Sequence, residues 1–426
     1  MRAMGDTLTT RGRAFLASGI TLLAAGLGLG FADLTRVGLM VVVLPLVASG
    51  LTRRRVGGIA VTRESEPARA TAGEVVTVTT TVANTGIRST PLMLAEERLD
   101  FALGERPRVL LGSLDAQQVR ALTYAVRPPV RGRHLLGPLT VQLRDPFGLT
   151  NRIVEVDGAT ELVVRPRTWP LGAARPPGTG VGAEGEIPFM VALHGEDDQS
   201  IREYRDGDDL RRIHWPATAR TGELMVRQED RPARRRAVVL LDPREPAHCG
   251  TGAGSSFEWA VSAAGSAVVH LAGLGYAVHL LSPETVQDGH ADLPVDPQDA
   301  LDILATTATT PALELAAMTR AGQGLLAGGG LLVAVLAPQD EQALSRIATL
   351  RQPGGTALGL VLDTASFGPP RESGRQPASP AAAARAVDLL RGSGWRASVV
   401  SAGDGIAQGW SRVGSVAARV GSEAVR

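Results

Sequence analysis

One short segment of this 426-residue chain contains the side chains that proton transfer requires. His214 follows the carboxylates Glu203 and Asp208, and a carboxylate beside an imidazole can act as an acid–base pair. No serine or cysteine that such a pair would activate lies nearby in the sequence. A hydrolase that uses His214 with a carboxylate is therefore one hypothesis, but not the one that we favour.

The same segment has two runs rich in acidic residues, Glu196–Asp198 and Asp206–Asp209. Carboxylate oxygens bind hard cations, so a metal site is a second hypothesis. The third interpretation is a tightly turned, ion-paired connector in which Tyr204 and Trp215 bury against the next domain. We favour the connector, with recognition of a partner protein as its functional extension, and we predict no catalytic residue.

A further candidate is Asp242, which ends the apolar run Arg236–Asp242. In a parallel sheet, ligands bind beyond the carboxyl ends of the strands. The position resembles the first aspartate of the Asp-x-Ser-x-Ser metal motif of von Willebrand factor A domains, but Arg244 and Pro246 replace the two serines. Arg244 brings a positive charge to the place of the cation. We therefore predict no metal here, and an ion pair of Arg244 with Asp242 or Glu245 in its place.

The totals exclude several other classes of site. The net charge of +1 and the isoelectric point near 8.1 give no reason to expect nucleic acid as a partner. All 44 basic residues are arginines, so an arginine here is no evidence of a choice over lysine. The only cysteine, Cys249, excludes an internal disulfide and a cysteine-rich metal site. The run Gly328–Gly330 lacks the lysine and the serine or threonine of a phosphate-binding loop, and we predict no cofactor.

Two apolar runs near the amino terminus predict a membrane anchor. Ala14–Ala32 and Val37–Thr52 are uncharged, and Asp33–Arg36 separates them. At a rise of about 1.5 Å per residue they span roughly 24 to 28 Å, close to the thickness of a bilayer core. A cleaved signal peptide would not be followed directly by a second apolar run. Because arginine is enriched on the cytoplasmic side of membranes, we expect a hairpin in the cytoplasmic membrane with both termini and the soluble domains in the cytoplasm; the flanking arginines are Arg11, Arg13 and Arg53–Arg55.

After the anchor the hydrophobic period becomes two. Glu74–Asn84 alternates apolar residues with threonine, as a half-buried strand does. Segments of this kind, mostly separated by glycine or proline, predict an antiparallel β-sandwich of about seven strands, immunoglobulin-like in the broad sense. The other segments are Ile59–Arg63, Leu92–Arg98, Arg108–Leu111, Gln118–Arg127, Leu139–Leu143 and Glu161–Arg165.

The carboxy-terminal half alternates apolar runs with helical segments, which predicts a doubly wound parallel sheet with both faces covered. The expected strands are Arg236–Asp242, Tyr276–Ser282, Leu331–Leu336, Ala357–Asp363 and Trp395–Ser401; the expected helices are Ser256–Leu274, Gln298–Ala305, Glu341–Leu350 and Ala381–Arg391. We therefore divide the chain into an anchor (1–55), a β-sandwich (56–166), a linker with the central segment (167–233), an α/β domain (234–402) and a tail (403–426).

The central segment also resembles a known family. Its pattern R-x-Y-x-x-G-D-x-x-R-x-I-H-W-x-x-x-A-R is similar to the signature of the family catalogued as domain of unknown function 58. The run Asp145–Leu149, the membrane hairpin and the α/β domain resemble further features of that family. Pro216, which we expect to begin a short helix that ends at Gly222, stands where the resemblance suggests a basic residue. The residues that carry the signature are Arg202, Tyr204, Gly207, Asp208, Arg211, Ile213, His214, Trp215, Ala219 and Arg220.

The resemblance implies a partner rather than a reaction. It implies association with a MoxR-type AAA ATPase, and often with a transglutaminase-like membrane protein, and it implies a von Willebrand A-like fold for the α/β domain. We expect a non-enzymatic scaffold or adaptor that works with such an ATPase in the assembly or maturation of a membrane or envelope complex, with the signature residues as its binding surface. A metal-dependent ligand-binding or adhesion domain is the alternative, and the His214 hydrolase comes third.

Overall fold

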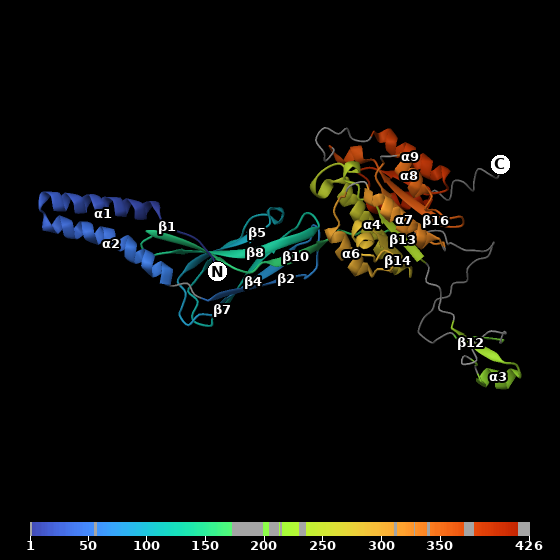
Figure 1. Cartoon of the computed structure of the whole chain (residues 1–426), viewed down its shortest axis with the longest axis horizontal. Coiled ribbons are helices and arrows are strands. Elements are labelled where there is room, and N and C mark those ends of the chain that lie inside the picture. Colours follow the sequence, from blue (N-terminus) through green and yellow to red (C-terminus); the bar gives the residue numbers. More distant parts are fainter. Residues whose placement is uncertain are drawn as a thin grey trace.

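The computed structural model has three parts in a row: a helical hairpin, a β-rich domain and an α/β domain (Figure 1). The coarse fold prediction is therefore confirmed. The structure describes residues 2–54, 58–172, 199–203, 213, 215–229, 236–310, 313–327, 329–338, 341–369 and 379–415.

The hairpin consists of α1 (Thr10–Leu29) and α2 (Ala32–Arg54). Thr10–Leu29 and Ala32–Gly50 are long and apolar enough to cross a bilayer, by length and composition. The turn between them is at Gly30 and not at the predicted Asp33–Arg36, which lies at the start of α2 just after Ala32. Gly30 has a φ of 73°, a left-handed conformation that glycine adopts without steric cost.

The structure adds a strand before the hairpin. β1 (Arg2–Leu8) pairs antiparallel with β9 (Thr150–Val156), so that Leu8 lies opposite Thr150. Residues 2–8 thus belong to the β-domain, and the predicted anchor begins too early. The chain enters the hairpin from this sheet and returns from α2 to β2 (Ile59–Glu66), so both ends of the hairpin lie on the side of the β-domain.

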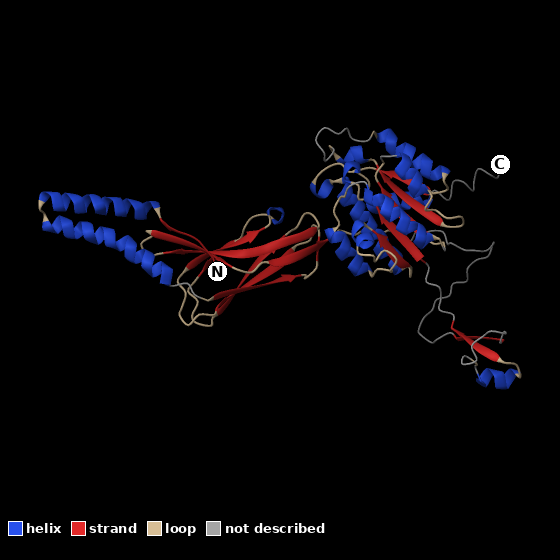
Figure 2. Cartoon of the chain, in the orientation of Figure 1, coloured by secondary structure: helices blue, strands red, loops and turns tan. Residues whose placement is uncertain are grey.

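The β-domain has two sheets with a common core (Figure 2). The smaller sheet has the order β2-β4-β7, with β4 at Val76–Asn84 and β7 at Val119–Val126. In the larger sheet β8 (Gly132–Arg144) pairs with β5 (Met93–Leu99), β9 and β10 (Thr160–Arg165); β6 (Arg108–Leu111) extends it beside β5, and β3 (Ala70–Thr71) beside β10. All predicted strands are present, whereas β1, β3, β9 and the first half of β8 were not predicted.

An ion pair joins the two sheets inside this core. The Arg63 Nε atom of β2 lies 2.8 Å from the Glu97 Oε1 atom of β5, and the Thr80 hydroxyl of β4 donates to the other carboxylate oxygen at 3.3 Å. Burial raises the pKa of Glu97, and the charge of Arg63 offsets only part of that rise. Both side chains are almost fully buried, so removal of either one would leave the other as a buried charge without a counter-ion.

The carboxy-terminal domain is a parallel sheet with helices on both faces. Its strand order is β14-β13-β15-β16-β17: Ala277–Leu281, Arg236–Leu241, Leu331–Leu336, Thr356–Leu362 and Arg396–Val400. One face is covered by α4 (Ser256–Gly273), α6 (Pro297–Thr306) and α10 (Ile406–Ser415). The other is covered by α7 (Leu313–Leu326), α8 (Glu341–Ala348) and α9 (Pro380–Gly392), with the short α5 (Pro283–Gln287) beside them.

The predicted strands and helices of this domain agree with the structure to within a few residues, but α5, α7 and α10 were not predicted as part of it. Trp410 and Val413 of α10 are buried in the same core as Leu241 of β13. The domain therefore extends past the predicted boundary at residue 402. Leu171, assigned to the linker, is buried in this core as well.

Two arginines of the β-domain hold the ends of α6. Arg131 Nε donates to the Leu304 carbonyl at 2.7 Å, its Nη2 donates to the Thr307 carbonyl at 2.5 Å, and its Nη1 pairs with Glu258 of α4. These carbonyls are among those left unpaired at a helix carboxyl end. Arg165 Nε donates to Asp302 at 2.6 Å and its Nη2 to the Gln298 carbonyl at 3.1 Å, near the start of the helix.

We predict that Arg131 couples the stability of the two domains. Arg131→Met leaves Glu258 and two helix-end carbonyls without their cation, which costs about 3 kcal/mol for a buried pair. Calorimetry of the full-length protein in detergent should show the α/β transition shift to lower temperature and separate from that of the β-domain. Arg133→Met is the control, because its pair with Glu161 is largely exposed. An unchanged transition in Arg131→Met would contradict this role.

Candidate functional site

The reversal of strand order places a candidate site at the carboxyl edge of the parallel sheet. The chain goes from β13 to β14 on one side and then to β15 on the other side of β13. The loops that follow β13 and β15 therefore diverge, and ligands in such sheets bind in the crevice between them. Asp242 directly follows β13, and Ala337 directly follows β15.

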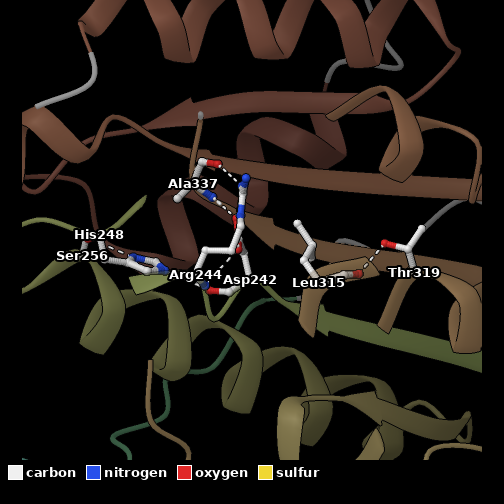
Figure 3. A network of polar contacts seen from close by, with 7 residues as sticks. All are labelled: Asp242, Arg244, His248, Ser256, Leu315, Thr319 and Ala337. Carbon is white, nitrogen blue, oxygen red and sulfur yellow. Dashed lines mark hydrogen bonds and ion pairs between the residues drawn. The ribbon is translucent and has the colours of Figure 1, made fainter. Parts of the chain in front are cut away.

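A guanidinium group fills this position (Figure 3). Arg244 Nε lies 2.8 Å from Asp242 Oδ1, and Arg244 Nη2 lies 2.6 Å from Asp242 Oδ2. The same Nη2 donates to the Ala337 carbonyl at 2.9 Å, and the Ala337 N–H donates to Asp242 Oδ2 at 3.1 Å. Asp242 is 0% exposed and Arg244 is 3% exposed. The predicted ion pair is confirmed, with Asp242 rather than Glu245 as the partner of Arg244.

The surroundings of Asp242 favour its charged form. Burial raises the pKa of the carboxyl, but the charge and hydrogen bonds of Arg244 outweigh it and hold the pKa below the ordinary value of 3.8. A carboxyl whose pKa is lowered in the folded state stabilises the fold at pH values above its ordinary pKa. That contribution is complete at neutral pH and is lost as the pH falls from about 3.8 toward the folded-state pKa.

The residues present do not fit a divalent cation of the von Willebrand factor A type. Such a cation needs free carboxylate and hydroxyl oxygens, whereas both oxygens of Asp242 face the guanidinium. In the described part of the chain, no three His, Cys, Asp or Glu side chains are grouped so as to hold a metal. Arg244 supplies the positive charge at this point itself.

A buried His–Ser pair lies beside the ion pair, and the sequence analysis did not identify it. His248 Nδ1 is 3.0 Å from Ser256 Oγ, and His248 Nε2 is 2.9 Å from the Asp242 carbonyl. A carbonyl only accepts, so Nε2 carries a proton and donates to it. His248 is 1% exposed and Ser256 is 0% exposed, so no substrate reaches them. The pair orients the loop after β13, where the Cys249 N–H also donates to Ser256.

A cleft of about 410 Å³ lies between the β-domain and this edge of the α/β domain. Pro129 and Trp169 line one side, and Trp259, Glu258 and Asp404 line the other. Trp259 Nε1 donates to the Asp404 carbonyl at 3.1 Å, which fixes the indole in the wall. The cleft presents aromatic rings beside Arg167 and two carboxylates, and these carboxylates already pair with Arg131 and Arg412.

Part of the signature segment is described. β11 (Gln199–Glu203) pairs with β12 (Met225–Glu229), with Arg202 opposite Val226. α3 (Trp215–Thr221) contains Pro216 in its first turn and is followed by Gly222 with a φ of 79°, as predicted. The expectation that Trp215 buries against the next domain is wrong: its side chain is 66% exposed.

Trp215 and Arg220 are therefore both on the surface of α3. The other predicted positions lie outside the described residues: Tyr204, Gly207, Asp208, Arg211 and His214, together with Glu196–Asp198 and Asp206–Asp209. The acid–base and cation hypotheses for this segment therefore stay predictions.

We predict that removing one partner of the Asp242–Arg244 pair destabilises the fold more than removing both, because a single removal leaves a buried charge unpaired. Arg244→Met leaves a buried carboxylate unpaired and should lower the free energy of unfolding by about 3–5 kcal/mol, measured by denaturant titration. The double variant Asp242→Asn/Arg244→Met, which has no uncompensated charge, should lose clearly less. Arg412→Met is the control, because the arginine of its pair with Asp404 is half exposed. A double variant that loses more than Arg244→Met would refute this interpretation.

Comparison with known proteins gives one family match and weak structural similarities. The CARDB domain of a Pyrococcus furiosus protein is 18% identical over 25% of this chain and 86% of its own length, with a TM-score of 0.19. The putative ApaA protein of Bordetella pertussis is 15% identical over 25% and 91%, with a TM-score of 0.19. The Pseudomonas fluorescens alkylpurine DNA glycosylase AlkC is 15% identical over 32% and 40%, with a TM-score of 0.20. Similarities this weak indicate neither a shared fold nor a shared function.

No curated protein matches the chain. A family model does match part of the chain: residues 200–285, from β11 through β13 and α4 to α5, fit the family described as protein of unknown function DUF58.

Proposed function

We propose that the protein is a non-enzymatic, membrane-anchored scaffold that presents its α/β domain to a MoxR-type AAA ATPase. Its role would be in the assembly or maturation of a membrane or envelope complex, and a transglutaminase-like membrane protein is a second expected partner. The observation that carries the proposal is that the Arg244 guanidinium occupies the carboxyl edge, where sheets of this kind usually bind ligands. A scaffold does not need an open ligand site at this edge.

The connections between the parts support a role in presentation. Arg131 and Arg165 fix the β-domain to α6, and the turn after β8 contacts the start of α1 through Thr9 and Leu149. We infer that the hairpin spans the cytoplasmic membrane with the soluble domains in the cytoplasm, because Arg11 and Arg13 flank its base.

We further propose an immunoglobulin-like β-sandwich and a von Willebrand A-like α/β domain. The two facing sheets support the first, and Asp242 at the end of the first α/β strand, followed by α4, supports the second. The metal-dependent alternative lacks support, because the Arg244 guanidinium occupies the position where the cation would bind. The hydrolase alternative depends on His214, which lies outside the described residues, so it stays a prediction.

The exposed side chains of α3 are the proposed ATPase contact. Exposed tryptophan and arginine are the residue types that dominate protein interfaces. Trp215 and Arg220 occupy one short helix, and Arg220 lies in its last turn. The match to the family model includes this helix.

We predict that Trp215→Ala and Arg220→Ala each lower recovery of the ATPase from a detergent extract. The expected loss is about tenfold or more in affinity, the range for an interface anchor. Membrane content and folding should not change, because both side chains are exposed. Arg385→Ala, an exposed arginine on α9, is the control. Failure of the wild type to recover any ATPase, with or without ATP, would contradict the proposal.

A further inference from the structure

The end of the β-domain beside the hairpin has an apolar surface that the proposed function does not use. Phe147 is 60% exposed in the turn between β8 and β9, Leu110 is 63% exposed near the end of β6, and Leu92 is 56% exposed just before β5. Met93 pairs with both Leu143 and Leu111, so the three residues lie at the same end of the sheet.

The turn that carries Phe147 is tied to the first turn of α1. The Thr9 hydroxyl donates to the Gly148 carbonyl at 2.6 Å, and the Thr9 N–H donates to the Leu149 carbonyl at 2.9 Å. A methyl group at Gly12 would clash with that Leu149 carbonyl, so glycine allows the turn to lie directly against α1. Phe147 is therefore held at the level where α1 begins.

The turn itself is held in one shape by Asp145. Its Oδ1 accepts from the Phe147 N–H at 2.8 Å, and its Oδ2 accepts from the Thr150 hydroxyl at 2.8 Å. Asp145 is 5% exposed, so Phe147 projects from a fixed, buried base. Phe147, Leu92 and Leu110 together form a group of exposed apolar side chains at one end of the sheet, and such groups mark contact surfaces.

An apolar groove of about 640 Å³ begins at this turn and runs along the outer face of the larger sheet. Leu92, Leu94 and Leu110 line it, and Arg144 and Asp145 lie at the end where the turn begins. An apolar groove with an arginine among its lining residues matches a phospholipid, whose acyl chain is apolar and whose phosphate pairs with guanidinium.

We propose that Phe147 and this groove form a phospholipid-contact surface that enters the interfacial layer of the bilayer. The inference rests on the proposed membrane anchor, since the same turn that carries Phe147 packs against the base of α1. Exposed aromatic and aliphatic side chains with nearby arginines are typical of protein surfaces that lie in the headgroup region. Lipid is favoured over a protein partner because the hairpin brings the membrane to this surface.

Single-cysteine labelling tests the proposal in the full-length protein. The native Cys249 is buried and is replaced by Cys249→Ala. An environment-sensitive fluorophore is then placed by Phe147→Cys or Leu110→Cys, and the protein is reconstituted in vesicles of phosphatidylcholine and phosphatidylglycerol with brominated acyl chains. Phe15→Cys within α1 reports the anchor, and Phe101→Cys is the matched control, because that phenylalanine is 98% exposed and lies beyond the far end of β5.

We expect the probes at residues 147 and 110 to lose fluorescence to the brominated lipid as the probe at residue 15 does, while the probe at residue 101 keeps its intensity. Quenching at residue 15 without quenching at 147 and 110 would overturn the lipid-contact surface and leave the anchor intact, and the groove would then serve a protein. Absence of quenching at residue 15 would remove the hairpin from the bilayer, and both proposals would fail together.

Discussion

Buried guanidinium groups paired with oxygen atoms hold the soluble part of this chain together at each of its main junctions. Arg63 joins the two sheets through Glu97, Arg131 and Arg165 join the β-domain to α6, and Arg244 closes the edge of the parallel sheet. A guanidinium presents several donors in a fixed plane, so one side chain satisfies a carboxylate and a carbonyl together. In each pair the hydrogen bonds replace those that the groups would make with water. Loss of one partner therefore destabilises the fold, because the other group stays buried and unpaired.

These junctions connect the hairpin end of the molecule to the carboxyl edge of the parallel sheet, which faces the β-domain across the cleft. The Leu149 carbonyl accepts from the residue that caps α1, and β8 runs from that turn to Arg131, which reaches α6 and α4. Arg244 then occupies the place where a sheet of this topology would bind a ligand. The arrangement favours presentation of an outer surface, and the signature helix α3 with exposed Trp215 supplies a candidate for it.

Sequence patterns predicted the strands and the ion pair that hydrophobic periodicity and local charge determine. The alternation in β4, the apolar runs of the parallel sheet and the pair of Arg244 with Asp242 all follow from local chemistry. The predictions were incomplete where contacts between distant parts of the chain determine the structure. Strand β1 forms because it pairs with β9, and α10 belongs to the α/β domain because Trp410 packs in its core. Trp215 was expected to bury against the next domain, but no residue of α3 is buried and the indole stays exposed.

The central claim is that Arg244 takes the place of a cation, so that the α/β domain serves as a scaffold. Electron paramagnetic resonance of Mn²⁺ tests it directly, because the sharp spectrum of the free ion weakens when a protein binds it. The account predicts that the wild-type protein leaves the free Mn²⁺ signal unchanged at millimolar concentrations. A loss of that signal which Asp242→Asn abolishes would place a metal at the sheet edge and contradict the account.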